Sequence, residues 1–174
     1  DFLTLREQFG EIKGLNFVFA GDGRNNMSNS LMIGCSKMGL NFTCLAPKSL
    51  WPNEELVKQC EEYAKESGAK IRFTEDVKEA VEGADCIYTD VWASMGQEGE
   101  AEIRKKAFKG FQINDEVMAV AKPDAMVQHC LPAHREEEIT AKVFEEHANE
   151  IFDEAENRLH AQKAVMVLLM GNKD

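Results

Sequence analysis

The chain has 174 residues, of which 44% are hydrophobic and 29% charged, so it suits one globular domain and excludes a disordered or fibrous protein. Its 31 acidic and 20 basic side chains give a formal charge of −11, which opposes binding to nucleic acid and to anionic membranes. The longest apolar stretch, residues 164–170, is far shorter than the roughly 20 residues of a membrane span.

Apolar runs of strand length alternate with amphipathic segments along the chain. Residues 1–5 read as a helix already under way, which predicts that the chain is part of a longer protein. Strands are then expected at residues 15–20, 41–46, 70–73, 85–89 and 126–129, and helices at 26–38, 52–67 and 75–81. This alternation predicts one α/β domain over residues 1–174, with a doubly wound, mostly parallel sheet and helices on both faces, as in Rossmann-like folds. Such sheets bind ligands at the carboxyl ends of their strands, so the segments after the first, fourth and fifth strands are the candidate sites.

The first of these segments reads GDGRNNMSNS, residues 21–30. Its Gly-x-Gly opening suggests a dinucleotide site, but the third glycine is missing and the second strand ends without an acidic residue for a ribose. A tight turn feeding a helix suits a small anion such as a carboxylate, with Asn25, Asn26, Ser28 and Asn29 as side-chain donors. The alternative is that these asparagines only cap the helix.

The second segment, DVWASMGQE, begins with Asp90 where a buried strand emerges. Asp90 could accept a hydrogen bond from a ligand ammonium, with Ser94 and the Met95 backbone completing a polar pocket. Asp90 could equally cap the next turn, with Trp92 and Met95 as core residues.

The third segment, HCLPAHR, follows the fifth strand. Adjacent side chains on an extended chain point to opposite faces, so His129 is not expected to activate Cys130 as a nucleophile. His129, Cys130 and His134 lack a fourth ligand at zinc spacing, and the five cysteines are widely spaced without a Cys-x-x-Cys pair. We therefore expect no metal, no disulfide and a reducing, cytoplasmic location, and by itself Cys130 could be an inert core residue.

Together with DEAENRLHAQKAVM, residues 153–166, these segments resemble the carbamoyltransferase family, and specifically its ornithine branch. GDGRNNMSNS is similar to that branch's asparagine-rich ornithine loop, DVWASMGQE to its Ser-Met-Gly loop and HCLP to its catalytic cysteine segment. The C-terminal segment is similar to its arginine-bearing helix. Four motifs occur in the family's order over nearly the whole chain.

The resemblance implies a role for each matching residue. Asn26 and the Met95 backbone would bind the α-carboxylate of L-ornithine, and Asp90 and Ser94 its α-ammonium. Cys130 and the Leu131 carbonyl would face the δ-amine, and Arg158 would polarise the carbamoyl group; these assignments make Asp90, Cys130 and Arg158 the catalytic set. The implied reaction forms citrulline and phosphate from ornithine and carbamoyl phosphate, without a cofactor, in arginine metabolism.

The family's Ser-Thr-Arg-Thr-Arg phosphate motif does not occur in this sequence. The resemblance places that motif in an N-terminal carbamoyl-phosphate domain and implies a homotrimer for the whole enzyme, so the chain alone should be inactive. Two alternatives stay open: carbamoyl transfer to another amine such as putrescine, and a non-catalytic domain that only binds small molecules.

Overall fold

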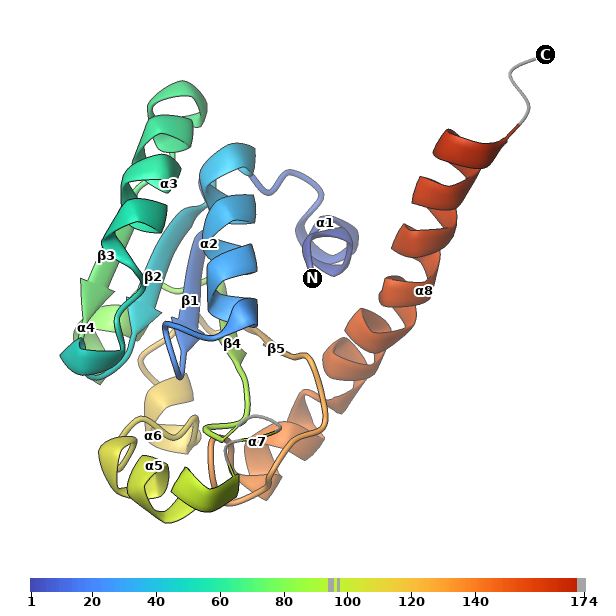
Figure 1. The fold of residues 1–174 in the computed structure, drawn as a ribbon. Helices are drawn as coiled ribbons and strands as arrows, with labels where there is room; N and C mark the ends of the chain where they lie inside the picture. Colours follow the sequence, from blue (N-terminus) through green and yellow to red (C-terminus); the bar gives the residue numbers. More distant parts are fainter. Residues whose placement is uncertain (94–95, 97, 172–174) are drawn as a thin grey trace.

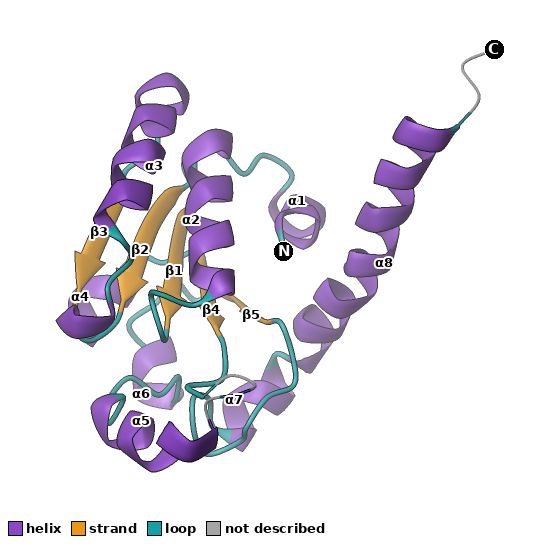
Figure 2. Ribbon diagram, viewed as in Figure 1, coloured by secondary structure: helices purple, strands orange, loops and turns teal. Residues whose placement is uncertain are grey.

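Five parallel strands form a single sheet in the order β3-β2-β1-β4-β5 (Figures 1 and 2). The computed structural model describes residues 1–93, 96 and 98–171. The strands are β1 (Asn16–Ala20), β2 (Asn41–Leu45), β3 (Ile71–Thr74), β4 (Cys86–Thr89) and β5 (Met126–His129). The sequence placed each of them correctly to within one residue at either end. Strands β1, β2, β4 and β5 are almost fully buried and are therefore continuous apolar runs, whereas β3 is only partly buried.

The helices occupy the segments between the strands and both ends of the described chain. They are α1 (Phe2–Phe9), α2 (Asn26–Met38), α3 (Glu54–Ser67), α4 (Val77–Val81), α5 (Ala101–Ala107), α6 (Asp115–Met118), α7 (Ala141–Glu146) and α8 (Ala148–Met170), with short 3₁₀ turns η1 (Lys48–Leu50) and η2 (Glu98–Glu100). Helix α2 has the predicted bounds, because Asn25 caps its first turn and Gly39 ends it in the left-handed conformation.

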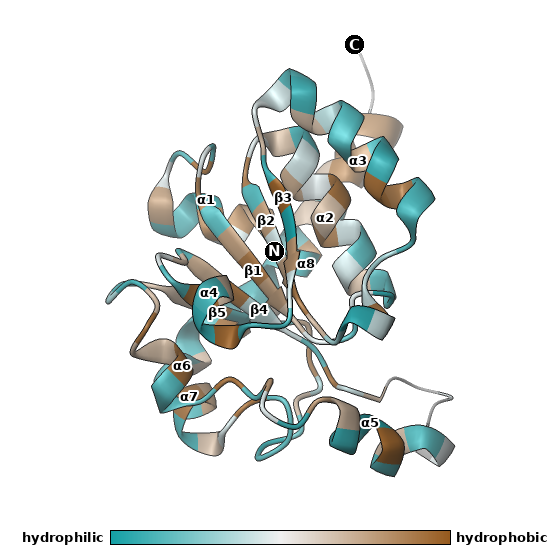
Figure 3. Ribbon diagram, turned by 90° about the vertical axis from the view of Figure 1, so that its left-hand side faces the viewer, coloured by the Kyte–Doolittle hydropathy of each residue, from teal (hydrophilic) through white to brown (hydrophobic). Residues whose placement is uncertain are grey.

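Side chains from the two faces of the sheet form two separate cores. Alternate residues of β1 divide between them: Phe17 and Phe19 face α1, α2 and α3, whereas Val18 and Ala20 face α4, α6 and α7. Figure 3 shows the hydrophobic residues along β1 and the mostly hydrophilic residues of α3, which lies at the outside. The predicted doubly wound α/β fold is thereby confirmed.

The strand order reverses between β1 and β4, which lie side by side in the sheet. A crevice forms at such a reversal, at the carboxyl ends of the strands. The loop after β1 and the loop after β4 therefore meet there, next to the end of β5.

Helix α8 packs on β5 through its first turns and then extends away from the sheet (Figure 1). Its last turns carry exposed apolar side chains, among them Leu168 and Leu169 at 73% and 80% exposure. Among the described residues, no helix is long and apolar enough to cross a lipid bilayer.

Candidate functional site

The loop from β1 to α2 is held tightly against β2 and the residues that follow it. A side chain at Gly23 would bring its Cβ within 2.6 Å of the Leu50 carbonyl oxygen and 2.8 Å of Cys44 Sγ. Glycine is needed at this position for close packing. The Gly-x-Gly pattern therefore has a packing explanation that requires no dinucleotide.

Three side chains from three different loops meet at the carboxyl ends of β1, β4 and β5. The Asn25 side-chain amide donates to Asp90 Oδ2 at 2.9 Å, and Cys130 Sγ donates to Asp90 Oδ1 at 3.1 Å. Asn25 also caps α2, since its Oδ1 accepts from the Ser28 backbone N–H at 2.7 Å. The capping interpretation of the asparagine loop is therefore confirmed for Asn25, whereas binding of an anion by this loop stays a prediction.

Asp90 is a buried carboxylate that accepts three hydrogen bonds from the described residues. Oδ1 accepts from the Val91 backbone N–H at 2.8 Å and from Cys130, and Oδ2 accepts from Asn25. A carboxylate offers about four accepting positions, two on each oxygen. Among the residues that the structure describes, Oδ2 has a single donor, which leaves it an accepting position suited to an ammonium group.

Cys130 is held as a neutral thiol in this arrangement. Burial raises the pKa of the Cys130 thiol well above its ordinary value, and the nearby charge of Asp90 raises it further. A thiol rather than a thiolate next to Asp90 suits a role in orienting a polar group, because nucleophilic attack requires the thiolate.

The segment that carries Cys130 is fixed from the other face of the sheet by a buried His129–Glu138 pair. His129 Nε2 lies 3.0 Å from Glu138 Oε1, while His129 Nδ1 accepts from the Leu131 backbone N–H at 2.9 Å. Because Nδ1 accepts, Nε2 carries the proton and donates it to Glu138. Both ring nitrogens of His129 are engaged, which confirms that this histidine does not activate Cys130.

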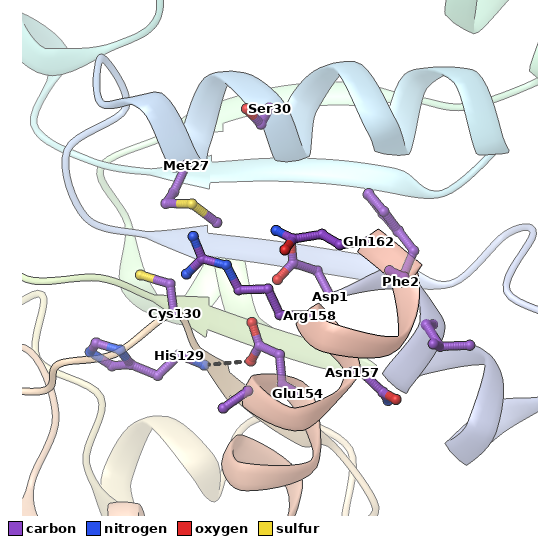
Figure 4. Close-up of a pocket in the computed structure, with 13 residues that line it drawn as sticks. Asp1, Phe2, Met27, Ser30, His129, Cys130, Glu154, Asn157, Arg158 and Gln162 are labelled. Carbon is purple, nitrogen blue, oxygen red and sulfur yellow. Dashed lines mark hydrogen bonds between the residues drawn. The ribbon is translucent and has the colours of Figure 1, made fainter. Parts of the chain in front are cut away.

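A cavity of about 480 Å³ lies beside Cys130, between α8, α1 and the start of α2. Met27, Cys130 and Arg158 line it, and Figure 4 shows the Arg158 guanidinium pointing toward Met27 and Cys130. Arg158 is exposed and makes no ion pair within the part of the chain that the structure describes. A free guanidinium at the wall of an open cavity is suited to an anion or a polarised carbonyl oxygen.

An ion pair between Asp22 and Arg104 joins the loop after β1 to helix α5. Arg104 Nη1 lies 2.7 Å from Asp22 Oδ2 and donates to the Trp92 carbonyl at 3.3 Å. Both side chains are largely buried, at 13% and 8% exposure for Arg104 and Asp22. Sequence reasoning missed this pair, because the two residues lie 82 positions apart and follow no motif.

The predicted site residues are not all brought to one point. Asn26 begins α2 with an exposed side chain, and its neighbour Asn25 contacts Asp90 instead. Leu131 follows Cys130 directly and has a positive φ of 56°. Ser94 and Met95 lie outside the described residues.

One group of possible metal ligands occurs among the described residues: His134, Glu137 and Glu138, with ligand atoms within 4.8 Å of one another. Two of these side chains already have partners. Glu137 pairs with Lys105 at 2.9 Å, and Glu138 accepts from His129 and from the His134 backbone N–H. These contacts hold Glu137 and Glu138 in place beside His134.

Comparison with known proteins places these residues in a family context. Residues 13–169 match the family model described as aspartate/ornithine carbamoyltransferase, Asp/Orn binding domain. An ornithine carbamoyltransferase of Pyrococcus abyssi is 50% identical over 171 residues, which are 98% of this chain and 54% of that protein.

Solved structures with the same fold include two ornithine carbamoyltransferases. That of Pyrococcus furiosus is 48% identical, with a TM-score of 0.92, over 100% of this chain and 55% of that one. The anabolic enzyme of Campylobacter jejuni is 38% identical, also with a TM-score of 0.92, over 97% and 56% of the two chains. The chain therefore spans about half the length of the relatives that it matches.

Proposed function

Because this chain belongs to the aspartate/ornithine carbamoyltransferase family, through its Asp/Orn binding domain, we propose that it binds L-ornithine and holds the δ-amine for carbamoylation. The observation that carries the proposal is the buried Asp90 carboxylate, which links the asparagine loop to Cys130 and accepts only three hydrogen bonds from the described residues, of the four that it can take. Its place at the strand-order reversal is where this class of sheet binds ligands.

In this proposal the amino-acid end of ornithine lies against the loops after β1 and β4. Asp90 accepts from the α-ammonium, and Ser94 assists it. Asn26 and the Met95 backbone bind the α-carboxylate, with the first turn of α2 adding unpaired backbone N–H groups and a favourable dipole. A diamine such as putrescine lacks the carboxylate and would leave these donors unpaired.

The other end of ornithine extends toward Cys130 and Arg158. The neutral δ-amine attacks the carbonyl carbon of carbamoyl phosphate; a C–N bond forms, the C–O bond to phosphate breaks, and the nitrogen loses a proton as citrulline and phosphate form. An alkyl amine with a pKa near 10.4 must first lose a proton, which costs about 4.6 kcal/mol at pH 7. Cys130 and the Leu131 carbonyl orient the amine, and Arg158 stabilises the charge that develops on the carbonyl oxygen.

We further propose that the phosphate of carbamoyl phosphate is bound by a second, N-terminal domain of the whole protein, which acts as a homotrimer in arginine biosynthesis. Two observations support the second domain: the relatives are about twice as long as this chain, and the sequence has no Ser-Thr-Arg-Thr-Arg motif. The exposed apolar end of α8 is a surface that such a domain could cover.

Calorimetric titration of the 174-residue chain tests the proposed ligand. L-Ornithine is compared with putrescine, which keeps two amines and lacks the carboxylate, and with 2-aminopentanoate, which keeps the amino-acid end and lacks the δ-amine. We expect ornithine and 2-aminopentanoate to bind with similar affinity and both to bind at least about ten-fold more tightly than putrescine. Equal or tighter binding of putrescine would contradict the proposal.

A further inference from the structure

The outer edge of β5 is closed by two carboxylates from α8. The Val127 backbone N–H donates to Glu150 Oε2 at 2.8 Å, and the His129 backbone N–H donates to Glu154 Oε2 at 2.9 Å. Glu150 and Glu154 are four residues apart and therefore lie on the same face of the helix. In both bonds a backbone N–H donates to a carboxylate, but they lie at different distances along the strand from Cys130. Glu150 Oε2 also lies 2.9 Å from His147 Nδ1.

Glu154 lies between the segment that carries Cys130 and the part of α8 that carries Arg158. His129, whose N–H it binds, directly precedes Cys130, and Arg158 stands one helical turn beyond Glu154 on α8. Glu154, Cys130 and Arg158 all line the same cavity (Figure 4). One hydrogen bond thus connects the strand that carries the thiol to the helix that carries the guanidinium.

Glu154 is 4% exposed, so the bond is shielded from water. If the acceptor is removed, the buried His129 N–H has no partner at the free edge of the sheet, and an unpaired buried donor is costly. The strand end and the helix then shift relative to each other until water can reach that donor. Glu150 is more exposed, with 29% of its side chain accessible, and Val127 lies three residues before Cys130.

We propose that Glu154 is a positioning residue for carbamoyl transfer: its hydrogen bond to the His129 N–H fixes the position of Cys130, directly after β5, relative to Arg158 on α8. The catalytic role of Glu154 rests on the proposed function. Its hydrogen bond to the His129 N–H is independent of that function. The carboxyl oxygen acts as an acceptor here, so an amide oxygen of the same shape should replace it. Reacting groups misplaced by about 1 Å can lose about a hundred-fold in rate, so a bond of this kind matters for turnover.

The test compares alanine and glutamine at the two equivalent positions. Glu154→Gln and Glu154→Ala both remove the charge, and both therefore remove its contribution to the raised pKa of Cys130. Only the alanine variant removes the acceptor. Glu150→Gln and Glu150→Ala form the matched pair at the same strand edge, away from the thiol, and thermal unfolding of all four variants shows that each is folded.

The first readout is the rate at which iodoacetamide alkylates Cys130 in the 174-residue chain, followed by peptide mass spectrometry across pH 7 to pH 10. We expect Glu154→Ala to react about five-fold faster than Glu154→Gln across this range, and the Glu150 pair to agree within about two-fold. Equal rates for the two Glu154 variants, or an equal difference at Glu150, would overturn the proposal.

The second readout is turnover by the full-length protein that includes this chain. Glu154→Ala should lower kcat by about ten-fold or more with a smaller change in KM for ornithine, and Glu154→Gln should restore it. A glutamine variant as slow as the alanine variant would overturn the proposal. If the two Glu154 variants differ in alkylation but the chain does not bind ornithine, the proposed function is wrong. The role of Glu154 in fixing β5 relative to α8 would then still be supported.

Discussion

Cys130 Sγ donates a hydrogen bond to Asp90 Oδ1 across 3.1 Å, and this bond joins the carboxyl ends of two neighbouring strands. Thr89 and His129 are paired in the register of β4 and β5, so the next residue of each strand emerges at the same level of the sheet. The alternation of side chains turns both Cys130 and Asp90 toward the asparagine loop. The position of the site therefore follows from strand register.

Asp90→Asn should weaken ornithine binding by about 1.5 to 3 kcal/mol, because the variant loses a charged acceptor for the α-ammonium. Calorimetry on the 174-residue chain measures the change. Asp124→Asn, an exposed position that changes the net charge equally, is the control. Unchanged affinity in Asp90→Asn would mean that Asp90 is only a structural cap.

The raised pKa of Cys130 predicts slow alkylation at neutral pH. The thiol stays protonated well above pH 9, so the rate should keep rising with pH beyond the range in which a free cysteine levels off. Asp90→Asn removes a neighbouring negative charge and should lower that pKa, which speeds alkylation at pH 8. Cys35, Cys44, Cys60 and Cys86 are buried and serve as internal controls in the same peptide map. A Cys130 rate that levels off below pH 9 would contradict this prediction.

Arg104→Ala should destabilise the fold by about 3 kcal/mol, because it leaves the largely buried Asp22 carboxylate without a cationic partner. Lys106→Ala is the control, since Lys106 is exposed on the same helix. Urea denaturation gives both free energies of unfolding. A loss no larger than that of Lys106→Ala would show that water replaces the guanidinium at little cost.

The 174-residue chain should form no measurable citrulline from ornithine and carbamoyl phosphate, although it binds ornithine. A net charge of −11 and the absence of a phosphate motif leave little to hold the phosphate, and the lost positioning is worth roughly 7 to 11 kcal/mol of barrier. The assay is repeated after a separately produced carbamoyl-phosphate domain is added. Steady turnover by the chain alone, abolished in Cys130→Ala, would reveal a phosphate site within these residues.

The exposed apolar end of α8 should make the 174-residue chain self-associate. Val167, Leu168, Leu169 and Met170 are each 69% to 80% exposed. Leu168→Gln combined with Leu169→Gln should shift sedimentation toward the monomer, whereas Ile103→Gln, at a 70% exposed position on α5, should not. A concentration-independent monomer before any substitution would refute this expectation.

The strands, α2 and the meeting of the loops after β1, β4 and β5 could be predicted from the sequence, because each depends on local signals. Apolar runs mark buried strands, Asn25 and Gly39 mark the ends of α2, and Asp90 and Cys130 follow directly from strand ends. Helices α5, α6 and α7 are only four to seven residues long, too short for a helical period to stand out.

The pairings across the fold could not be predicted. The choice of Asn25 over Asn26 as the partner of Asp90 depends on where the first helical turn begins, to within one residue. The contact of Glu154 with the His129 N–H joins residues 25 positions apart and depends on how α8 lies along β5. Neither relationship has a signature in the sequence.

The two carboxylates of α8 also decide how the sheet can meet other chains. The outward N–H groups of β5, at Val127 and His129, already have acceptors, so an extended peptide cannot add to that side without displacing Glu150 and Glu154. At the opposite edge, β3 is the last strand of the sheet that the described residues form. Strand addition by a misfolded neighbour is therefore directed to β3, which is four residues long and places Arg72 in its exposed middle. A short edge strand with an exposed charge is a poor template for aggregation. The sheet is thus protected from strand addition at β5 by the two carboxylates of α8, and at β3 by the short length and the charge of that strand.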